Sequence, residues 1–136
     1  MAKTGKQATN SKILPGSKQA SETIWKSVAR IQEKWELNAA QMARLLHVKP
    51  PTFHNWKHQA EIPISAELTP DIELIIAVIA IYRSLSAMFA SPKDQVAWLN
   101  SKHPQLQAIP IKFAESSSSN LFQLRSYLDF VRGRGA

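Results

Sequence analysis

The feature that most constrains this chain is an uncharged apolar run between residues 74 and 82, LIIAVIAIY. A membrane-spanning helix needs about 20 such residues, so the run is too short for a span. Thr69-Pro70-Asp71 before it supplies an N-cap, a proline suited to a first turn, and an acid at the positive helix end. We therefore expect a helix over residues 70–89, apolar on most faces between residues 72 and 85. Such a helix lies either at the centre of a bundle or at an oligomer interface.

Helical periodicity also dominates elsewhere, and no strand pattern competes with it. The expected helices cover residues 22–36, 39–46, 50–59, 70–89, 92–102, 110–115 and 120–132. We expect Ser21 to cap the first helix, and residues 116–119 to form a polar linker before the last one. The apolar stripe of the last helix consists of Leu121, Leu124, Tyr127, Leu128 and Val131. The sequence thus predicts an all-α fold, with a three-helix helix-turn-helix unit followed by a small four-helix bundle.

The excess of positive over negative charge is confined to one half of the chain. The first 60 residues hold ten Lys/Arg and three Glu, whereas residues 61–136 hold seven Lys/Arg and seven Asp/Glu, so the formal net charge of +7 belongs to the first half. This asymmetry favours polyanion binding by the first half and protein contact by the second. A basic segment that only aids solubility is the alternative. The predicted organisation is a flexible basic arm over residues 1–20, a helix-turn-helix domain over 21–60, a linker over 61–69 and a second helical domain over 70–136.

The segment 38–57 is typical of a bihelical DNA-reading unit, with two short helices joined by a short turn. Asn38 is a good N-cap, Ala43 allows the helices to approach closely, and Phe53 and Trp56 face the core. The outward side chains of the second helix are then Pro51, Thr52, His54, Asn55 and Lys57.

Those outward residue types suit the major groove. Asn55 can pair with adenine, Thr52 can meet a thymine methyl group or a phosphate, and His54 can reach a guanine edge or a phosphate. Basic side chains that we expect at phosphates are Arg44, Lys49 and Lys57, extended by Lys3, Lys6, Lys12 and Lys18 of the arm.

A helical hairpin with a solvated polar face is the competing interpretation of the same segment. Two positions favour it. His47 stands where the turn usually has glycine, and a non-glycine residue in a left-handed turn costs about 1 kcal/mol. Lys49 stands where a Ser or Thr cap usually precedes the reading helix.

No catalytic or metal-binding constellation is recognisable, so we expect a protein that is not an enzyme and has no cofactor. The chain has no cysteine, which excludes thiolate ligands and cysteine nucleophiles and suits a reducing cytoplasm. His54 and His58 have metal-ligand spacing, but no carboxylate or cysteine completes a site, so no metal is predicted. Residues 1–16 contain no apolar stretch typical of a secretory signal, and we expect no membrane partner.

Segments from both halves together resemble the MbcA/ParS/Xre antitoxin family, over about residues 24–136. In the first half they are Trp35-Glu36-Leu37, Ala43-Arg44-Leu45-Leu46-His47-Val48 and Trp56. In the second half they are Met88-Phe89, Ser91-Pro92, Ala97-Trp98-Leu99, His103-Pro104, Ile109-Pro110, Leu128 and Arg132-Gly133. The chain departs from the family where Leu106-Gln107-Ala108 replaces a Leu-Gly-Gly turn, and where a serine run replaces a glycine after the short helix.

The resemblance implies an antitoxin of a type II toxin–antitoxin system. It implies a cognate toxin, commonly a RES-domain enzyme that destroys NAD, and repression of the chain's own operon by operator binding. Residues 70–136 would then be the toxin-binding and dimerisation domain, and we expect a homodimer or a larger hetero-oligomer with the toxin. Two rivals are a simple helix-turn-helix repressor whose second half only dimerises, and a protein-interaction module with a degenerate helix-turn-helix.

The C-terminus offers a physical route to inhibition of such an enzyme. Arg132 and Arg134, flanked by Gly133 and Gly135, could form a mobile tail that pairs with acidic residues at the toxin's mouth. The alternative is a basic helix end that only complements the helix dipole. The wider toxin-binding surface is expected among the exposed members of Phe113, Leu121, Phe122, Arg125 and Tyr127.

Overall fold

The computed structural model describes residues 17–64 and 70–133, and in these ranges the chain is helical without strands. The helices are α2 (Lys18–Lys34), α3 (Ala39–Leu46), α4 (Pro50–Gln59), α5 (Pro70–Met88), α6 (Pro92–Leu99), α7 (Pro110–Ser116) and α8 (Ser118–Val131). The all-α prediction is therefore confirmed for the described residues.

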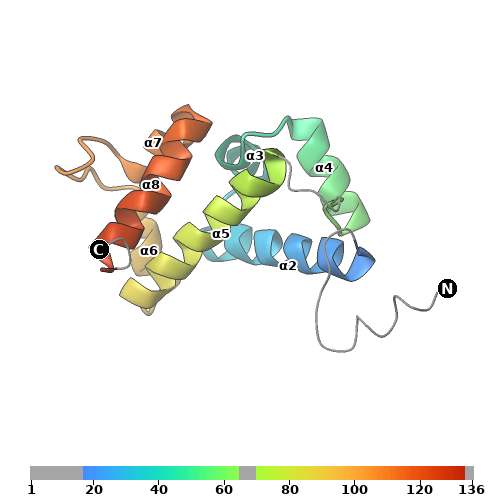
Figure 1. Cartoon of the computed structure of the whole chain (residues 1–136), viewed down its shortest axis with the longest axis horizontal. Helices are drawn as coiled ribbons and strands as arrows, with labels where there is room; N and C mark the ends of the chain where they lie inside the picture. The colour runs from blue at the N-terminus through green and yellow to red at the C-terminus, as the bar shows by residue number, and fades with distance from the viewer. Residues whose placement is uncertain (1–16, 65–69, 134–136) are drawn as a thin grey trace.

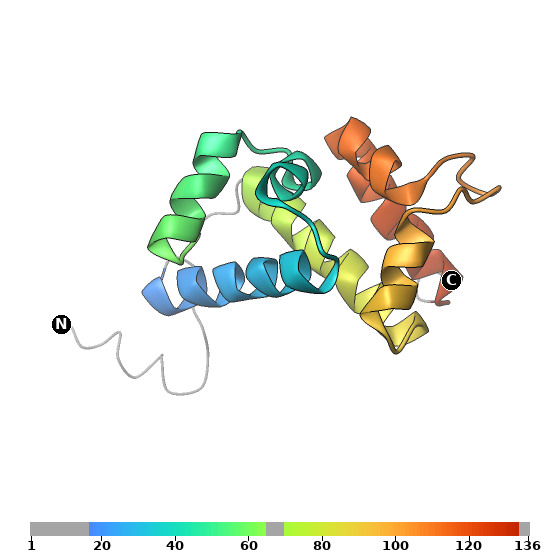
Figure 2. The same ribbon diagram turned by 180° about the vertical axis from the view of Figure 1, so that it is seen from behind.

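Helix α5 lies between two groups of helices (Figures 1 and 2). On one side it packs against α2 and α3, and on the other against α6 and α8. Ile75, Ala77, Val78 and Leu85 of this helix are buried almost completely. Of the two positions predicted for the apolar helix, the centre of the fold is therefore the one observed. The predicted homodimer would need another surface.

One hydrophobic cluster extends through both groups of helices. It includes Trp25 and Leu46 from the first group, Ile75 from α5, and Leu99 and Leu128 from the second. Ile62, in the predicted linker, is also buried, and its N–H donates to the Ser21 carbonyl at 3.1 Å. The chain just after α4 is therefore fastened to α2.

The first helix begins earlier than predicted. Ser17, not Ser21, is its N-cap, and its hydroxyl accepts from the Ala20 N–H at 3.0 Å. Residues 18–20 thus belong to the helix rather than to a flexible arm. The Lys18 ammonium lies 3.1 Å from a Glu61 carboxylate oxygen and 3.7 Å from one of Glu22. Glu61 is 43 residues from Lys18, so helical periodicity does not reveal this partner of the additional turn.

The predicted linker over residues 116–119 is shorter than expected. Helix α7 continues to Ser116, and α8 begins at Ser118, so Ser117 is the only residue between them. The Ser117 hydroxyl accepts from the Asn120 N–H at 3.0 Å and caps α8. Most of the serine run is consequently helical.

No single helix in the described ranges is long and apolar enough to cross a membrane. Helices α5 and α6 meet the combined criterion of length and composition only when they are joined across a bend of 117°.

A buried side-chain bond joins the two groups of helices. The Trp35 indole N–H donates to Gln95 Oε1 at 3.0 Å, and Gln95 Nε2 donates to the Phe89 carbonyl at 3.2 Å and to Ser86 Oγ at 3.4 Å. Gln95 is 2% exposed, so its amide depends on these partners. The Gln95 side chain thus links the end of α2 to α6 within the core.

Replacing Gln95 by leucine should lower the free energy of unfolding by about 1–3 kcal/mol, because the Trp35 N–H loses its acceptor inside the core. Urea denaturation measures the loss. Lys93→Ala, at an exposed position of the same helix, should change it by less than about 0.5 kcal/mol. In a Trp35→Phe background, Gln95→Leu should lower the free energy of unfolding by less than it does in the original chain. If the losses of the two single variants simply add in the double variant, the proposed bond between the two side chains contributes nothing.

Candidate functional site

Helices α3 and α4 begin and end where the sequence predicts. Asn38 Oδ1 accepts from the Gln41 N–H at 2.8 Å, and Gln41 Oε1 accepts from the Asn38 N–H at 2.8 Å, so a capping box starts α3. Helix α4 starts with two prolines, and Lys49 before it provides no side-chain cap. Proline needs no cap for its absent N–H, so the missing Ser or Thr is tolerated here.

His47 occupies the left-handed conformation at the turn, with φ 58° and ψ 40°. Its N–H donates to the Arg44 carbonyl and the Val48 N–H donates to the Ala43 carbonyl, which is the Schellman pattern at a helix end. The turn therefore has the backbone conformation that glycine favours, although the residue is histidine.

The side chain of His47 also forms a hydrogen bond to a distant part of the chain. His47 Nε2 lies 2.8 Å from the carbonyl oxygen of Ala114 on α7, so it donates to that oxygen. Beside it, Arg44 Nε lies 3.7 Å from a Glu115 carboxylate oxygen. Arg44 is 57% exposed and the pair contributes little energy, but this predicted phosphate contact already has a partner.

The predicted outward face of α4 is outward in the structure. Phe53 and Trp56 are buried, and Phe53 packs against Trp25 with ring centroids 5.6 Å apart. Exposed residues on the other side of the helix, and just before it, are Lys49, Pro51, His54, Asn55 and Lys57. Thr52 is half-buried. None of these side chains bonds to another described residue, so their polar groups are available to a ligand.

Asp71 lies close to this surface, which sequence reasoning missed. With His47, Lys49 and Thr52 it lines a hollow of about 260 Å³. A carboxylate there repels phosphate, so the first turn of α5 limits how a polyanion can approach the start of α4.

The arm lysines are only partly within the described residues. Lys18 is in α2, and its hydrogen bond to Glu61, with the charges of Glu61 and Glu22, raises the pKa of its ammonium group. It is therefore engaged with carboxylates rather than free for phosphate. Lys3, Lys6 and Lys12 lie outside the described residues.

The predicted toxin-binding residues fall into three groups. Phe113 and Tyr127 are half-buried and pack against the core, and Leu121 is fully buried, as expected of ordinary core residues. Phe122 is 37% exposed and Arg125 is half-buried. The remaining residues belong to the C-terminal tail.

Arg132 is not part of a mobile tail. Its guanidinium donates to the buried Ser84 hydroxyl of α5 at 3.0 Å and so fastens the end of α8. Gly133 follows in the left-handed conformation, with φ 81°, and a Cβ there would meet no atom within 4 Å. Arg134 lies outside the described residues, so a tail that plugs an enzyme could begin only after Gly133.

Two exposed apolar residues at the end of α8 were missed or misplaced. Phe130 is 69% exposed, and Val131, predicted in the core stripe, is 46% exposed. Phe130 is two residues after buried Leu128, which turns it about 200° around the helix. That spacing could have identified Phe130 from the sequence.

Comparison with known proteins gives no independent assignment: no protein-family model matches the chain, and no curated protein matches it significantly. Within the described residues, no three His, Cys, Asp or Glu side chains gather as a metal site would require.

His47 and Ala60 form a matched pair of left-handed residues, each with φ 58°. Ala60→Gly should raise the free energy of unfolding by about 0.5–1 kcal/mol, because glycine adopts this conformation without strain. His47→Gly gains the same relief but loses the bond to Ala114, so its gain should be smaller by about 1 kcal/mol or reversed. Equal gains in urea denaturation would show that the His47 bond contributes nothing.

Proposed function

We propose that the chain is a DNA-binding antitoxin, in which α2–α4 form a helix-turn-helix unit that binds operator DNA and α5–α8 form a unit that binds a toxin. The observation that carries the proposal is the outer face of α4. Polar and basic side chains there have no partner among the described residues, while the opposite face of the same short helix is anchored in the core.

The DNA part of the proposal rests on the residue types of that face. Asn55 and His54 offer groups that reach base edges, and Thr52 offers a methyl group and a hydroxyl. Lys49 and Lys57 flank them as phosphate contacts. All of the chain's net positive charge belongs to its first 60 residues, which include this unit.

The proposal that α5–α8 bind a toxin rests on the resemblance to the antitoxin family and on the surface of α8. Phe130 and Val131 expose apolar surface at the end of this helix, with Phe122 two turns earlier. Exposed aromatic residues are typical anchors of protein interfaces. The toxin class, a RES-domain enzyme that degrades NAD, follows from the resemblance alone.

Sequence preference should depend on Thr52 and Asn55. The double variant Thr52→Ala/Asn55→Ala should bind the chain's own promoter and unrelated DNA alike, with weak affinity that still falls as salt increases. Fluorescence anisotropy against both duplexes over a salt series measures this. Surviving promoter preference would show that α4 is not the reading helix.

A charge-matched pair of variants separates specific phosphate contacts from general electrostatics. Lys49→Ala/Lys57→Ala should weaken binding to every duplex and reduce the slope of log affinity against log salt by about 2. Lys93→Ala/Lys102→Ala removes the same charge from exposed positions of the second half and should change that slope little.

The toxin part is tested by co-expression with the product of the neighbouring open reading frame. The two proteins should copurify, growth should be restored, and cellular NAD should be preserved. Phe130→Ala/Val131→Ala should weaken the complex roughly tenfold or more, whereas Lys112→Ala on α7 should not. If no complex forms while promoter DNA is still bound, the chain is a repressor and not an antitoxin.

A further inference from the structure

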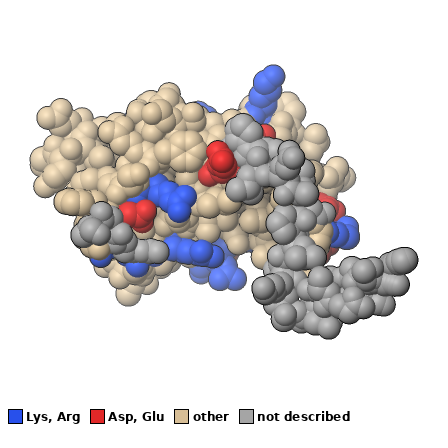
Figure 3. Space-filling view, in the orientation of Figure 1, with Lys and Arg blue, Asp and Glu red and all other residues tan. Residues whose placement is uncertain are grey.

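A hollow of about 370 Å³ lies between α2 and α5, apart from the outer face of α4 and the end of α8. Lys26 and Arg30 of α2 and Arg83 of α5 line it, and no carboxylate within residues 17–64 and 70–133 does. In the space-filling view, basic side chains gather over the region where these two helices pack together (Figure 3).

The three cations of the hollow have no counter-ion within the described parts of the chain. None of them forms an ion pair or a hydrogen bond with another described residue, unlike Lys18 and Arg44 elsewhere in the molecule. Like charges gathered on a concave surface raise the local positive potential and attract anions. The hollow is therefore electrostatically suited to an anion that the described residues do not supply.

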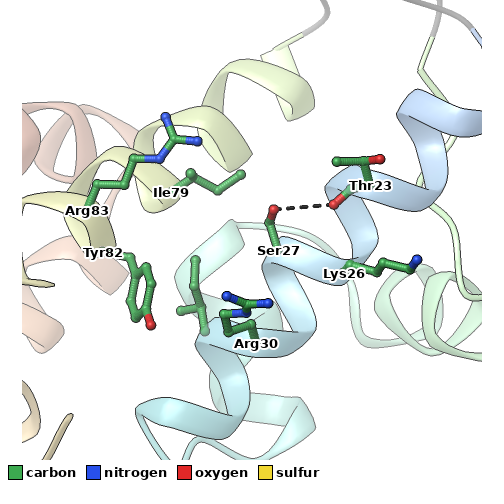
Figure 4. A pocket seen from close by; sticks show the side chains of 8 residues that line it. Thr23, Lys26, Ser27, Arg30, Ile79, Tyr82 and Arg83 are labelled. Carbon is green, nitrogen blue, oxygen red and sulfur yellow. Dashed lines mark hydrogen bonds between the residues drawn. The ribbon is translucent and has the colours of Figure 1, made fainter. Parts of the chain in front are cut away.

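The other groups in the hollow suit a phosphorylated ligand. Tyr82 of α5 and Arg30 of α2 reach into the same space from opposite walls, whereas Lys26 extends toward its outer end (Figure 4). Tyr82 forms no hydrogen bond with a described residue, so its hydroxyl is free to donate. Thr23 adds a hydroxyl along one wall, whereas the Ser27 hydroxyl donates to the Thr23 carbonyl at 3.3 Å. Phosphate oxygens accept hydrogen bonds from guanidinium groups and hydroxyls.

The size and walls of the hollow indicate more than a free phosphate ion. Its volume is within the range of small-molecule sites, about 300–1,000 Å³. Ile31, Ile79 and the ring of Tyr82 provide apolar surface beside the donors. We propose that this hollow binds a phosphorylated small molecule of nucleotide size. Arg30 and Arg83, which lie at different ends of the hollow (Figure 4), would attract its phosphates, and the apolar wall would lie against a planar base.

Such a ligand would bridge the two halves of the chain, because α2 belongs to the first and α5 to the second. Tyr82 also packs against Trp35, with ring centroids 5.7 Å apart. A ligand against Tyr82 should therefore alter the fluorescence of Trp35, which gives a second readout.

The test is isothermal titration calorimetry of the full chain, without DNA, using ADP, AMP, adenosine and inorganic phosphate as probes. One ADP or AMP should bind per chain, more tightly than adenosine and more tightly than phosphate. Arg30→Gln/Arg83→Gln should weaken that binding roughly tenfold or more. Lys93→Gln/Lys102→Gln, which removes the same charge from exposed positions outside the hollow, should leave it unchanged.

Four outcomes would overturn the inference. The first is that no probe binds at millimolar concentration. The second is that both double variants weaken binding equally, which would mean a general charge effect. The third is that inorganic phosphate binds as tightly as ADP, which would mean that the hollow binds an adventitious ion only. Finally, Arg30→Gln/Arg83→Gln could weaken promoter binding while no nucleotide binds, which would assign the hollow to DNA. Because Thr52 and Asn55 are untouched, this test is independent of the proposed reading helix.

Discussion

The fold depends on enclosing one helix that has almost no polar side. Between Ile72 and Leu85, α5 has buried or half-buried side chains in nearly every direction, so neighbours must cover it all round. Burial of a leucine or isoleucine side chain stabilises a fold by about 1.5–3 kcal/mol, and α5 supplies several such side chains. Because α2 and α3 cover one side and α6 and α8 the other, neither group encloses the helix alone.

Polar contacts between the two groups make their arrangement specific. Apolar packing alone tolerates small shifts, whereas a buried hydrogen bond fixes direction and distance. Trp35 with Gln95 fixes α2 against α6, and His47 with Ala114 fixes the turn before α4 against α7. The orientation of the proposed reading helix is consequently set in part by the half of the chain proposed to bind a toxin.

The features that could be predicted from the sequence are those set by residues close to them in the chain. The bounds of α3 and α4 follow from Asn38, Gln41 and the prolines after Lys49, all within a few residues of the helix ends. The predicted start of α2 was wrong because Ser17, and not Ser21, caps the helix. Distant Glu61 pairs with Lys18 in the additional turn, and single-sequence periodicity contains no information on that contact. The same limit applies to His47: its unsuitability for a left-handed turn is visible in the sequence, but its partner is 67 residues away.

The two candidate sites also differ in how far the sequence alone could predict them. The outer face of α4 is a property of one short helix, so the spacing of Phe53 and Trp56 was sufficient to predict it. The basic hollow requires α2 and α5 to meet, and Arg30 and Arg83 are far apart in the sequence. The bond from Arg132 to Ser84 likewise depends on how α8 packs against α5, so the sequence could not decide between a mobile Arg132 and one that is part of a fixed helix end.

The left-handed residues have a consequence for the lifetime of the protein in a cell. Glu36, His47, Ala60 and Gln107 all have φ between 54° and 58°, and each such non-glycine residue costs about 1 kcal/mol or more. A difference of 1–2 kcal/mol changes the unfolded fraction by roughly 5–30-fold, and unfolded chains are what proteases degrade. Compared with glycine at the same position, each such turn that no other contact offsets therefore enlarges the fraction of chains that a protease can degrade.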